Sequence, residues 1–157
     1  MPTLREIPVD APEAHALLTE YFRSRELGFA RQNAVYTPAF PDPAAFTPPA
    51  GVFLVVHDDG QAVGCGGVRR IADGPAGIRY EVKHLYLRPE TRGRGWGRLL
   101  LGELEQRARA WGAAELVLDT HHSLAAAAAL YASAGFTPIE PFNDNPNATV
   151  WYGKPLQ

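Results

Sequence analysis

Three alternating glycines among basic residues, in the run from Arg92 to Arg98, constrain the fold of this chain more than any other feature. The run separates a strand-like segment, Val82 to Leu87, from a leucine-rich amphipathic segment that begins at Leu99. Glycines allow several backbone N–H groups to point into one concavity, and a following helix adds the positive end of its dipole. The pattern therefore predicts a strand, an anion-binding turn and a helix, with a phosphorylated ligand at the turn.

Composition sets the broad class of the chain. With 157 residues, of which 46% are hydrophobic, the sequence predicts one domain, residues 1–157, with a core of its own. The formal net charge of −2 gives no support to nucleic-acid binding, and no apolar run approaches the length that spans a membrane. The polar N-terminus and the single Cys65 point to a cytoplasmic protein, in which Cys65 is a small buried hydrophobe rather than a nucleophile.

Turn residues and hydrophobic periodicity divide the chain into short strands and three helices. The turns at Asp58-Asp59-Gly60 and at residues 72–77 predict three consecutive antiparallel strands. The order of strand, helix, loop, three strands, helix, strand, helix and two strands predicts a mixed α/β sheet that is not doubly wound. The expected strands are Thr3 to Val9, Val52 to Val56, Ala62 to Ile71, Ile78 to Leu87, Glu115 to Leu118, Phe136 to Ile139 and Thr149 to Tyr152. The expected helices run from a cap at Asp10 to Gly28, from the glycine turn to Gly112, and from Leu124 to Ala134 with Ser123 as the cap.

Two familiar phosphate-binding loops do not fit the glycine run. A nucleotide P-loop has a lysine and a serine or threonine after its last glycine, where this chain has Arg98 and Leu99. A dinucleotide-binding loop has glycines spaced G-x-G-x-x-G, whereas Gly93, Gly95 and Gly97 alternate. The turn is therefore predicted to bind neither kind of nucleotide.

The spacing Arg-x-x-Gly-x-Gly at Arg92, Gly95 and Gly97 resembles the acyl-CoA pyrophosphate loop of the GCN5-related N-acetyltransferases, the GNAT superfamily. The segment from Glu81 to Glu90 resembles the central strand of that family and its exit, and Leu130 to Phe136 is similar to the family's L-Y-x-x-x-G-F element. The three elements occur in the family's order over roughly the C-terminal half. The resemblance implies a mostly antiparallel central sheet with one splayed parallel pair of strands, flanked by helices.

The same resemblance implies acetyl-CoA as the co-substrate. Its pyrophosphate would lie on the N–H groups of residues 94–99, and its pantetheine arm would pair with the strand edge at residues 85–87, beside a parallel strand at residues 115–118. Many relatives have an asparagine at the start of the next helix, and Ser123 is expected to take its place here. The expected cofactor-binding residues are Leu85, Tyr86, Leu87, Arg92, Gly93, Arg94, Gly95, Trp96, Gly97, Arg98, Leu99 and Ser123.

Acyl transfer to an amine needs a base for the amine and a hydrogen-bond donor for the departing thiolate. Glu81 matches the strand glutamate that many GNAT members use as the base, directly or through a water, although a salt bridge with Arg79 or Lys83 is a structural alternative. His84 is a competing base, expected on the opposite face of the strand from Glu81. Tyr131 matches the family tyrosine that donates to the coenzyme sulfur, and its position is also compatible with a core tyrosine.

The acceptor pocket of this superfamily is built largely by the region between the first helix and the second strand. Here that region is the proline-rich segment from Ala30 to Gly51, and Tyr36, Phe40 and Phe46 are the expected substrate-binding residues. The loop from Phe142 to Asn147 is expected to close the other side. The resemblance implies a primary amine of a small molecule or peptide as acceptor, without specifying which.

The sequence is compatible with two modes of action, one catalytic and one not. Direct attack in a ternary complex is expected, because no well-placed nucleophile suggests a covalent acetyl-enzyme. A non-catalytic acyl-CoA-binding sensor or interaction module is the alternative, and the pair Glu81 and Tyr131 argues against it. His121 and His122 lack further ligands at suitable spacing, so no metal is expected. The exposed edges of the final strands are compatible with a homodimer.

Overall fold

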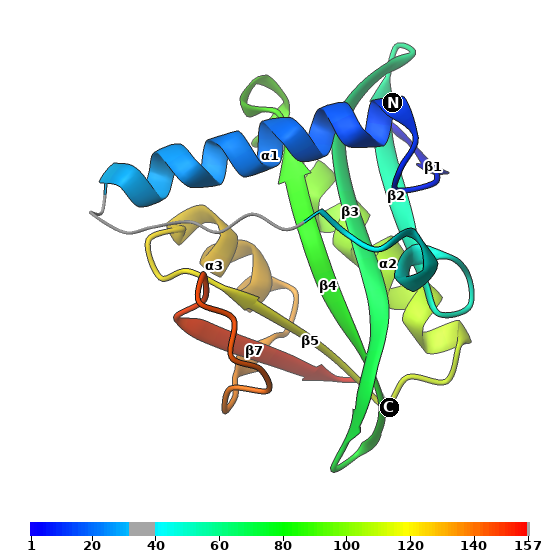
Figure 1. Cartoon of the computed structure of the whole chain (residues 1–157), viewed down its shortest axis with the longest axis vertical. Coiled ribbons are helices and arrows are strands. Elements are labelled where there is room, and N and C mark those ends of the chain that lie inside the picture. Colours follow the sequence, from blue (N-terminus) through cyan, green and yellow to red (C-terminus); the bar gives the residue numbers. More distant parts are fainter. Residues whose placement is uncertain (32–39, 157) are drawn as a thin grey trace.

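The computed structural model describes residues 1–31 and 40–156 and contains a seven-stranded sheet with helices on both faces (Figure 1). Short 3-10 turns precede β2 and α2, at Pro43–Phe46 and Pro89–Thr91. The strands are β1 (Thr3–Glu6), β2 (Gly51–Asp58), β3 (Gln61–Gly74), β4 (Gly77–Leu87), β5 (Glu115–Thr120), β6 (Thr137–Pro138) and β7 (Val150–Pro155). The helices are α1 (Pro12–Arg31), α2 (Trp96–Ala110) and α3 (Ala125–Ser133).

The order of strands in the sheet is β1-β2-β3-β4-β5-β7-β6. Every neighbouring pair is antiparallel except β4 and β5, which are parallel. The β2–β3 connection is the expected tight turn, with Asp59 at φ 50 and Gly60 at φ 79, the left-handed conformations that a two-residue hairpin turn needs. The predicted mixed sheet, with a three-stranded meander and one parallel pair, is confirmed.

The helices bury one apolar stripe each against opposite faces of the sheet (Figure 1). The stripe of α2 belongs to the same core cluster as β2, β4 and β5, and that of α1 to a second cluster with β2 and β3. Gly112, at φ 87, ends α2 as expected. Helix α1, however, continues past Gly28, because Phe29 is only 2% exposed and packs in the last turn. In residues 1–31 and 40–156, no helix combines the length and apolarity that crossing a membrane requires.

A bulge at His84 bends β4. Cys65 pairs with Tyr86 and Gly67 pairs with Lys83, so Gly66 alone faces both His84 and Leu85. The extra residue, His84, has φ 58, which is the left-handed conformation that such a bulge can use.

The bulge reverses one of our expectations, because Glu81 and His84 lie on the same face of the sheet. Tyr80 and Val82 belong to the cluster under α2, so Glu81 between them points to the α1 face. The His84 ring packs against Tyr21 and Phe22, with ring centroids 5.7 and 5.6 Å away. The extra residue breaks the alternation of side chains, which a sequence read as regular strand does not reveal.

Strands β4 and β5 pair over a short stretch and then diverge (Figure 1). Their parallel register joins Arg79–Glu81 to Glu115–Val117 and ends there. Beyond Glu81, therefore, the edge of β4 that faces β5 carries no strand-pairing bonds to it. Helix α3 packs into the same core cluster as α2, beside this opening. The predicted splayed parallel pair is confirmed, and the splay makes room for a site.

Candidate active site

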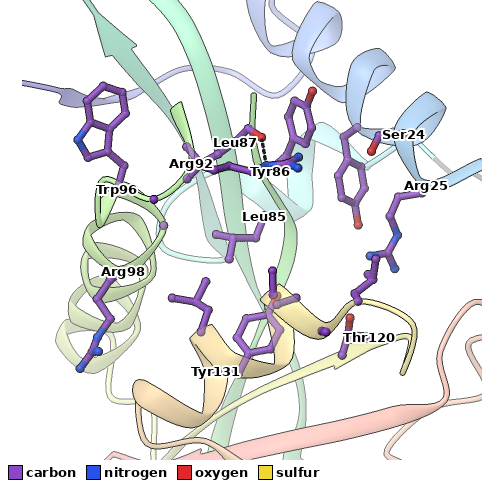
Figure 2. Close-up of a pocket in the computed structure, with 18 of the residues that line it drawn as sticks. Ser24, Arg25, Leu85, Tyr86, Leu87, Arg92, Trp96, Arg98, Thr120 and Tyr131 are labelled. Carbon is purple, nitrogen blue, oxygen red and sulfur yellow. Dashed lines mark hydrogen bonds between the residues drawn. The ribbon is translucent and has the colours of Figure 1, made fainter. Parts of the chain in front are cut away.

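A pocket of about 580 Å³ occupies the space where β4 and β5 diverge (Figure 2). The N-terminus of α2 forms one end, Ser24 and Arg25 of α1 form the other, and Leu85 and Tyr131 lie between them. The lining residues are Tyr21, Ser24, Arg25, Leu85, Tyr86, Leu87, Arg92, Gly93, Gly95, Trp96, Gly97, Arg98, Asp119, Thr120, Ser123, Leu124, Ala125, Ala126, Ala127, Leu130 and Tyr131. The pocket thus runs through the sheet, from the α2 and α3 side to the α1 side.

The N-terminus of α2 presents backbone donors to this pocket. Gly95 is the cap residue, at φ 80, and no side chain caps the helix. The first backbone bond of the helix joins the Leu99 N–H to the Gly95 carbonyl at 3.1 Å. The N–H groups of residues 96–98 therefore precede the helical bonding and suit an anion, together with the helix dipole. Gly93, also at φ 80, gives the turn its second left-handed residue.

The basic side chains of the turn differ in their positions. The Arg92 Nε donates to the Leu87 carbonyl at 3.0 Å, and the Arg98 guanidinium donates to the Ser133 hydroxyl at 3.2 Å. Arg94 lies over the Trp96 ring, 5.3 Å from its centroid, and does not line the pocket. Leu99 is 48% exposed and also lies outside the pocket. Of the twelve expected cofactor-binding residues, Arg94 and Leu99 therefore have side chains directed elsewhere, although their backbone belongs to the turn and the start of α2.

The edge of β4 forms the floor of the pocket, through Leu85, Tyr86 and Leu87. Gly97 of α2 lies next to this floor. A Cβ at Gly97 would lie 3.5 Å from Leu87 Cδ1 and 3.4 Å from Leu130 Cδ2, which are ordinary van der Waals contacts, so α2 lies directly against β4 and α3 here. The open strand edge and the helix N-terminus thus meet at one point.

Tyr131 of α3 lies at the middle of the pocket (Figure 2). It is 7% exposed, and its ring packs against Phe136 and Tyr152 at centroid distances of 6.0 and 5.9 Å. Burial raises the pKa of the Tyr131 hydroxyl above its ordinary value of 10.0. The hydroxyl is therefore neutral at physiological pH and has a proton that it can donate in a hydrogen bond.

Glu81 lies at the apex of the splay, outside the pocket lining. It is 1% exposed, and its Oε1 accepts hydrogen bonds from Arg69 Nε at 3.2 Å and from the terminal Arg69 nitrogen at 3.0 Å. Its Oε2 is 3.7 Å from Lys83 Nζ and has no hydrogen-bond partner in the part of the chain that the structure describes. The salt bridge to Lys83, which was the structural alternative for Glu81, is present, and Arg69 rather than Arg79 is the second cation.

Comparisons with known proteins agree with this geometry. The family model described as the Acetyltransferase (GNAT) family matches residues 12–136. The chain belongs to the GNAT family. A Schizosaccharomyces pombe protein, named as an uncharacterized N-acetyltransferase, is 36% identical over 148 residues, which cover 94% of this chain and 88% of the relative.

Solved structures of GNAT proteins share the fold. The crystal structure of a GNAT-family acetyltransferase from Staphylococcus aureus superposes with a TM-score of 0.78 at 16% identity, covering 100% of both chains. A GNAT acetyltransferase from Elizabethkingia anophelis, crystallised with acetyl-CoA bound, matches with a TM-score of 0.67 at 17% identity over 99% of this chain and 98% of that one. At these identities the likeness establishes the fold.

Ser123 of this GNAT protein lines the pocket but does not cap α3, contrary to our expectation. Helix α3 begins at Ala125 with Leu124 at the cap position. The Ser123 hydroxyl instead lies 2.7 Å from His121 Nδ1, and the Ser123 N–H donates to the same nitrogen at 3.2 Å. This local turn uses the serine side chain and displaces the start of the helix by one residue.

Three residues were expected to bind the acceptor, and the two that the structure describes, Phe40 and Phe46, do not line the pocket. Tyr36 lies outside the described residues. Phe40 is 54% exposed and stacks on His15, with ring centroids 4.8 Å apart. Phe46 is 5% exposed and packs edge-on against Phe53 in the core under α1. The geometry therefore gives Phe46 a packing role.

Sequence reasoning missed one wall of the GNAT pocket. Tyr21, Ser24 and Arg25 line it from α1, and Asp119 and Thr120 line it from the end of β5. The three helical residues have the i, i+3, i+4 spacing of one helix face, and a polar pair at the end of a parallel strand is a known place for site residues. Both signals were present in the sequence, but only the fold brings the two segments together.

Two reactive side chains, Cys65 and His84, lie outside the pocket, and desolvation holds both in their neutral forms. Cys65 is 0% exposed, and burial raises the pKa of its thiol far above the ordinary value of 9.0. Burial also lowers the pKa of His84 to about 3, so its ring is neutral at physiological pH. Neither residue lines the pocket. Within residues 1–31 and 40–156, no group of three or more His, Cys, Asp or Glu side chains could hold a metal ion.

Proposed function

We propose that this protein transfers an acetyl group from acetyl-CoA to the primary amine of a small molecule or peptide, by direct attack in a ternary complex. The observation that carries the proposal is the meeting of the uncapped α2 N-terminus, the open β4 edge and the Tyr131 hydroxyl in one pocket. Family membership supports acyl transfer in general, and the site supports the finer statement.

The residues present fit acetyl-CoA. A pyrophosphate suits the N–H groups of residues 96–98, where no side chain competes as a cap. A pantetheine arm, which carries amide groups, suits the β4 edge at residues 85–87, where pairing with β5 has ended. The volume of about 580 Å³ is within the range of cofactor sites. When bound, acetyl-CoA supplies a thioester whose carbonyl carbon can accept an amine.

Tyr131 is the proposed donor to the leaving sulfur. Its side chain lies in the middle of the pocket, between the α2 end and the α1 end (Figure 2). The raised pKa keeps the proton on the oxygen, so the hydroxyl can donate a hydrogen bond to a thiolate as the C–S bond breaks. An acceptor that binds as an ammonium ion first gives up one proton to solvent, and the sulfur leaves as a thiolate when the C–S bond breaks. The neutral amine nitrogen forms the new C–N bond and loses a second proton.

Glu81 is the proposed acceptor of that proton, through a water. The carboxylate does not line the pocket, which favours a relay over direct contact. Its Oε2, which has no hydrogen-bond partner in the described residues, is the atom that would accept from the water. Arg69 holds the other oxygen and so fixes the direction of Oε2. Direct attack is favoured because Cys65 is buried away from the pocket.

Thiol release from acetyl-CoA, measured with a panel of amines and with mass detection of the product, tests the proposal. Tyr131→Phe is expected to lower kcat by about 100-fold while the Kd for acetyl-CoA changes less than about twofold. Tyr152→Phe is the matched control, because Tyr152 touches the Tyr131 ring but does not line the pocket.

The role of Glu81 has its own comparison. Glu81→Gln removes the proposed proton acceptor, whereas Arg69→Met breaks the same ion pair and leaves the carboxylate. We expect a larger loss of kcat in Glu81→Gln. Equal losses of kcat in both variants would indicate that Glu81 is only a structural partner of Arg69. Tight acetyl-CoA binding without turnover of any amine would instead indicate a non-catalytic binding module.

A further inference from the structure

Asp119 is a carboxylate in the pocket that the proposed mechanism does not use. It lines the pocket from β5. In the parallel register Glu81 lies beside Val117, so Asp119 is two residues further along β5, on the same face and past the point where the strands separate. Asp119 is therefore placed at the open part of the splay, on the α1 side.

Two side-chain amides hold this carboxylate in one orientation. Asn143 Nδ2 donates to Asp119 Oδ2 at 2.7 Å, and Asn145 Nδ2 donates to Asp119 Oδ1 at 3.1 Å. Trp151 Nε1 in turn donates to Asn143 Oδ1 at 2.9 Å, which fixes the amide. Each carboxylate oxygen thus accepts one hydrogen bond from a neutral amide. We call Asn143 and Asn145 the amide clamp, and Trp151 holds one of its two amides in place.

The clamp leaves Asp119 with capacity for a ligand. An ionised carboxylate has about four lone-pair sites, of which the two amides use two. No Lys, Arg or His nitrogen among the described residues lies within the 4.0 Å of an ion pair with Asp119. A negative charge without an ion pair in a pocket attracts a cation, and the proposed acceptor is an amine.

Arg25 lines the same pocket and supplies the opposite charge; Figure 2 shows it on the side where Thr120, the residue after Asp119, is drawn. Its guanidinium lies over the rings of Tyr21 and Phe29, 5.6 and 5.7 Å from their centroids. Arg25 and Asp119 both influence the pKa of the Tyr21 and Tyr131 hydroxyls, in opposite directions. The two charged residues and the hydroxyl proposed to meet the sulfur thus line one pocket.

We propose that this region is the acceptor subsite and that it takes a zwitterionic amine, with its ammonium group on Asp119 and its anionic group on Arg25. The inference rests on the proposed function, because the pyrophosphate end at α2 orients the acetyl group toward α1. A free amino acid or a short peptide has the required pair of charges. A polyamine does not, because a second ammonium would meet Arg25.

The first experiment separates the charge of Asp119 from the loop that it anchors. Asp119→Asn is expected to raise the KM for the amine by about 10- to 100-fold, the loss of one charged hydrogen-bonded contact, with the KM for acetyl-CoA unchanged. Asp144→Asn is the matched control, because Asp144 is exposed in the same loop and does not line the pocket. Asn145→Ala removes one amide of the clamp and keeps the charge, and a smaller rise is expected.

The second experiment tests the anionic half. Each amino acid is compared with its decarboxylated amine, for example tyrosine with tyramine and lysine with cadaverine. The unchanged protein is expected to prefer the carboxylate-bearing member by about tenfold or more in kcat/KM, and Arg25→Gln is expected to abolish that preference. Arg23→Gln, an exposed change on the same helix, should keep it.

The outcomes distinguish this inference from the proposed function. Turnover of amines with equal KM values in Asp119→Asn and Asp144→Asn would overturn the ammonium subsite and leave the proposed function intact. Preference for the decarboxylated members, or for polyamines, would overturn the zwitterionic acceptor. If acetyl-CoA binds and no member of the panel is acetylated or bound in its presence, the proposed function and the subsite both fail.

Discussion

The bulge residue His84 should make the stability of this protein depend on pH in a specific way. Its imidazole packs among Tyr21, Phe22 and Phe46, and burial is the main cause that lowers its pKa to about 3 from the ordinary 6.5. The folded state therefore keeps His84 neutral over a range in which the unfolded chain takes up a proton. The contribution of the neutral His84 ring to the free energy of unfolding is complete above about pH 6.5 and decreases as the pH drops toward 3.

The size of the effect follows from linkage. For a group with an unfolded pKa of about 6.5 that stays neutral when folded, lowering the pH from 7 to 5 reduces the free energy of unfolding by about 2 kcal/mol. This value depends little on the folded pKa, because any value below about 4 leaves the folded imidazole neutral at pH 5. The prediction therefore depends on desolvation of the ring and not on how far below 4 the folded pKa lies.

Urea denaturation at several values between pH 7 and pH 5 measures this effect. His84→Asn, which tolerates the left-handed conformation at φ 58, and His84→Gln both remove the titrating ring. Each variant should lose about 2 kcal/mol less than the unchanged protein over this range, since the carboxylates contribute equally to all three. Parallel stability curves for the three proteins would refute the reasoning, because the ring would then be protonated without unfolding.

Three further changes have simple expectations. Gly95→Ala should cost about 1 kcal/mol in urea denaturation, because a Cβ is strained at φ 80, and should raise the Kd for CoA in calorimetry; an unchanged Kd would separate the turn from ligand binding. Phe46→Leu should lower the free energy of unfolding by about 1 kcal/mol with the amine KM within about twofold, whereas a large rise in KM would return Phe46 to the acceptor site. Cys65→Ala should keep kcat within about threefold, and its inactivation would indicate a covalent acetyl-enzyme.

The glycine turn and the second helix were predictable because their causes are local. Gly93 and Gly95 are the residues that adopt φ 80, and the leucines that follow at helical spacing bury one face. The hairpin at Asp59-Gly60 is a similar case, since two adjacent residues determine the turn. The parallel pair of strands and the position of Tyr131 were predicted from the resemblance to the family's motifs and not from local features.

The sequence by itself therefore determined the end of the pocket at the glycine turn, whereas the tertiary structure decided the other end. Arg25 and Asp119 are 94 positions apart in the numbering and line one pocket, which lies where β4 has separated from β5. The bulge in β4 placed His84 and Glu81 on one face, and packing took Phe46 into the core. Local conformation follows from neighbouring residues, but the convergence of distant charges depends on how strands pair and where that pairing ends.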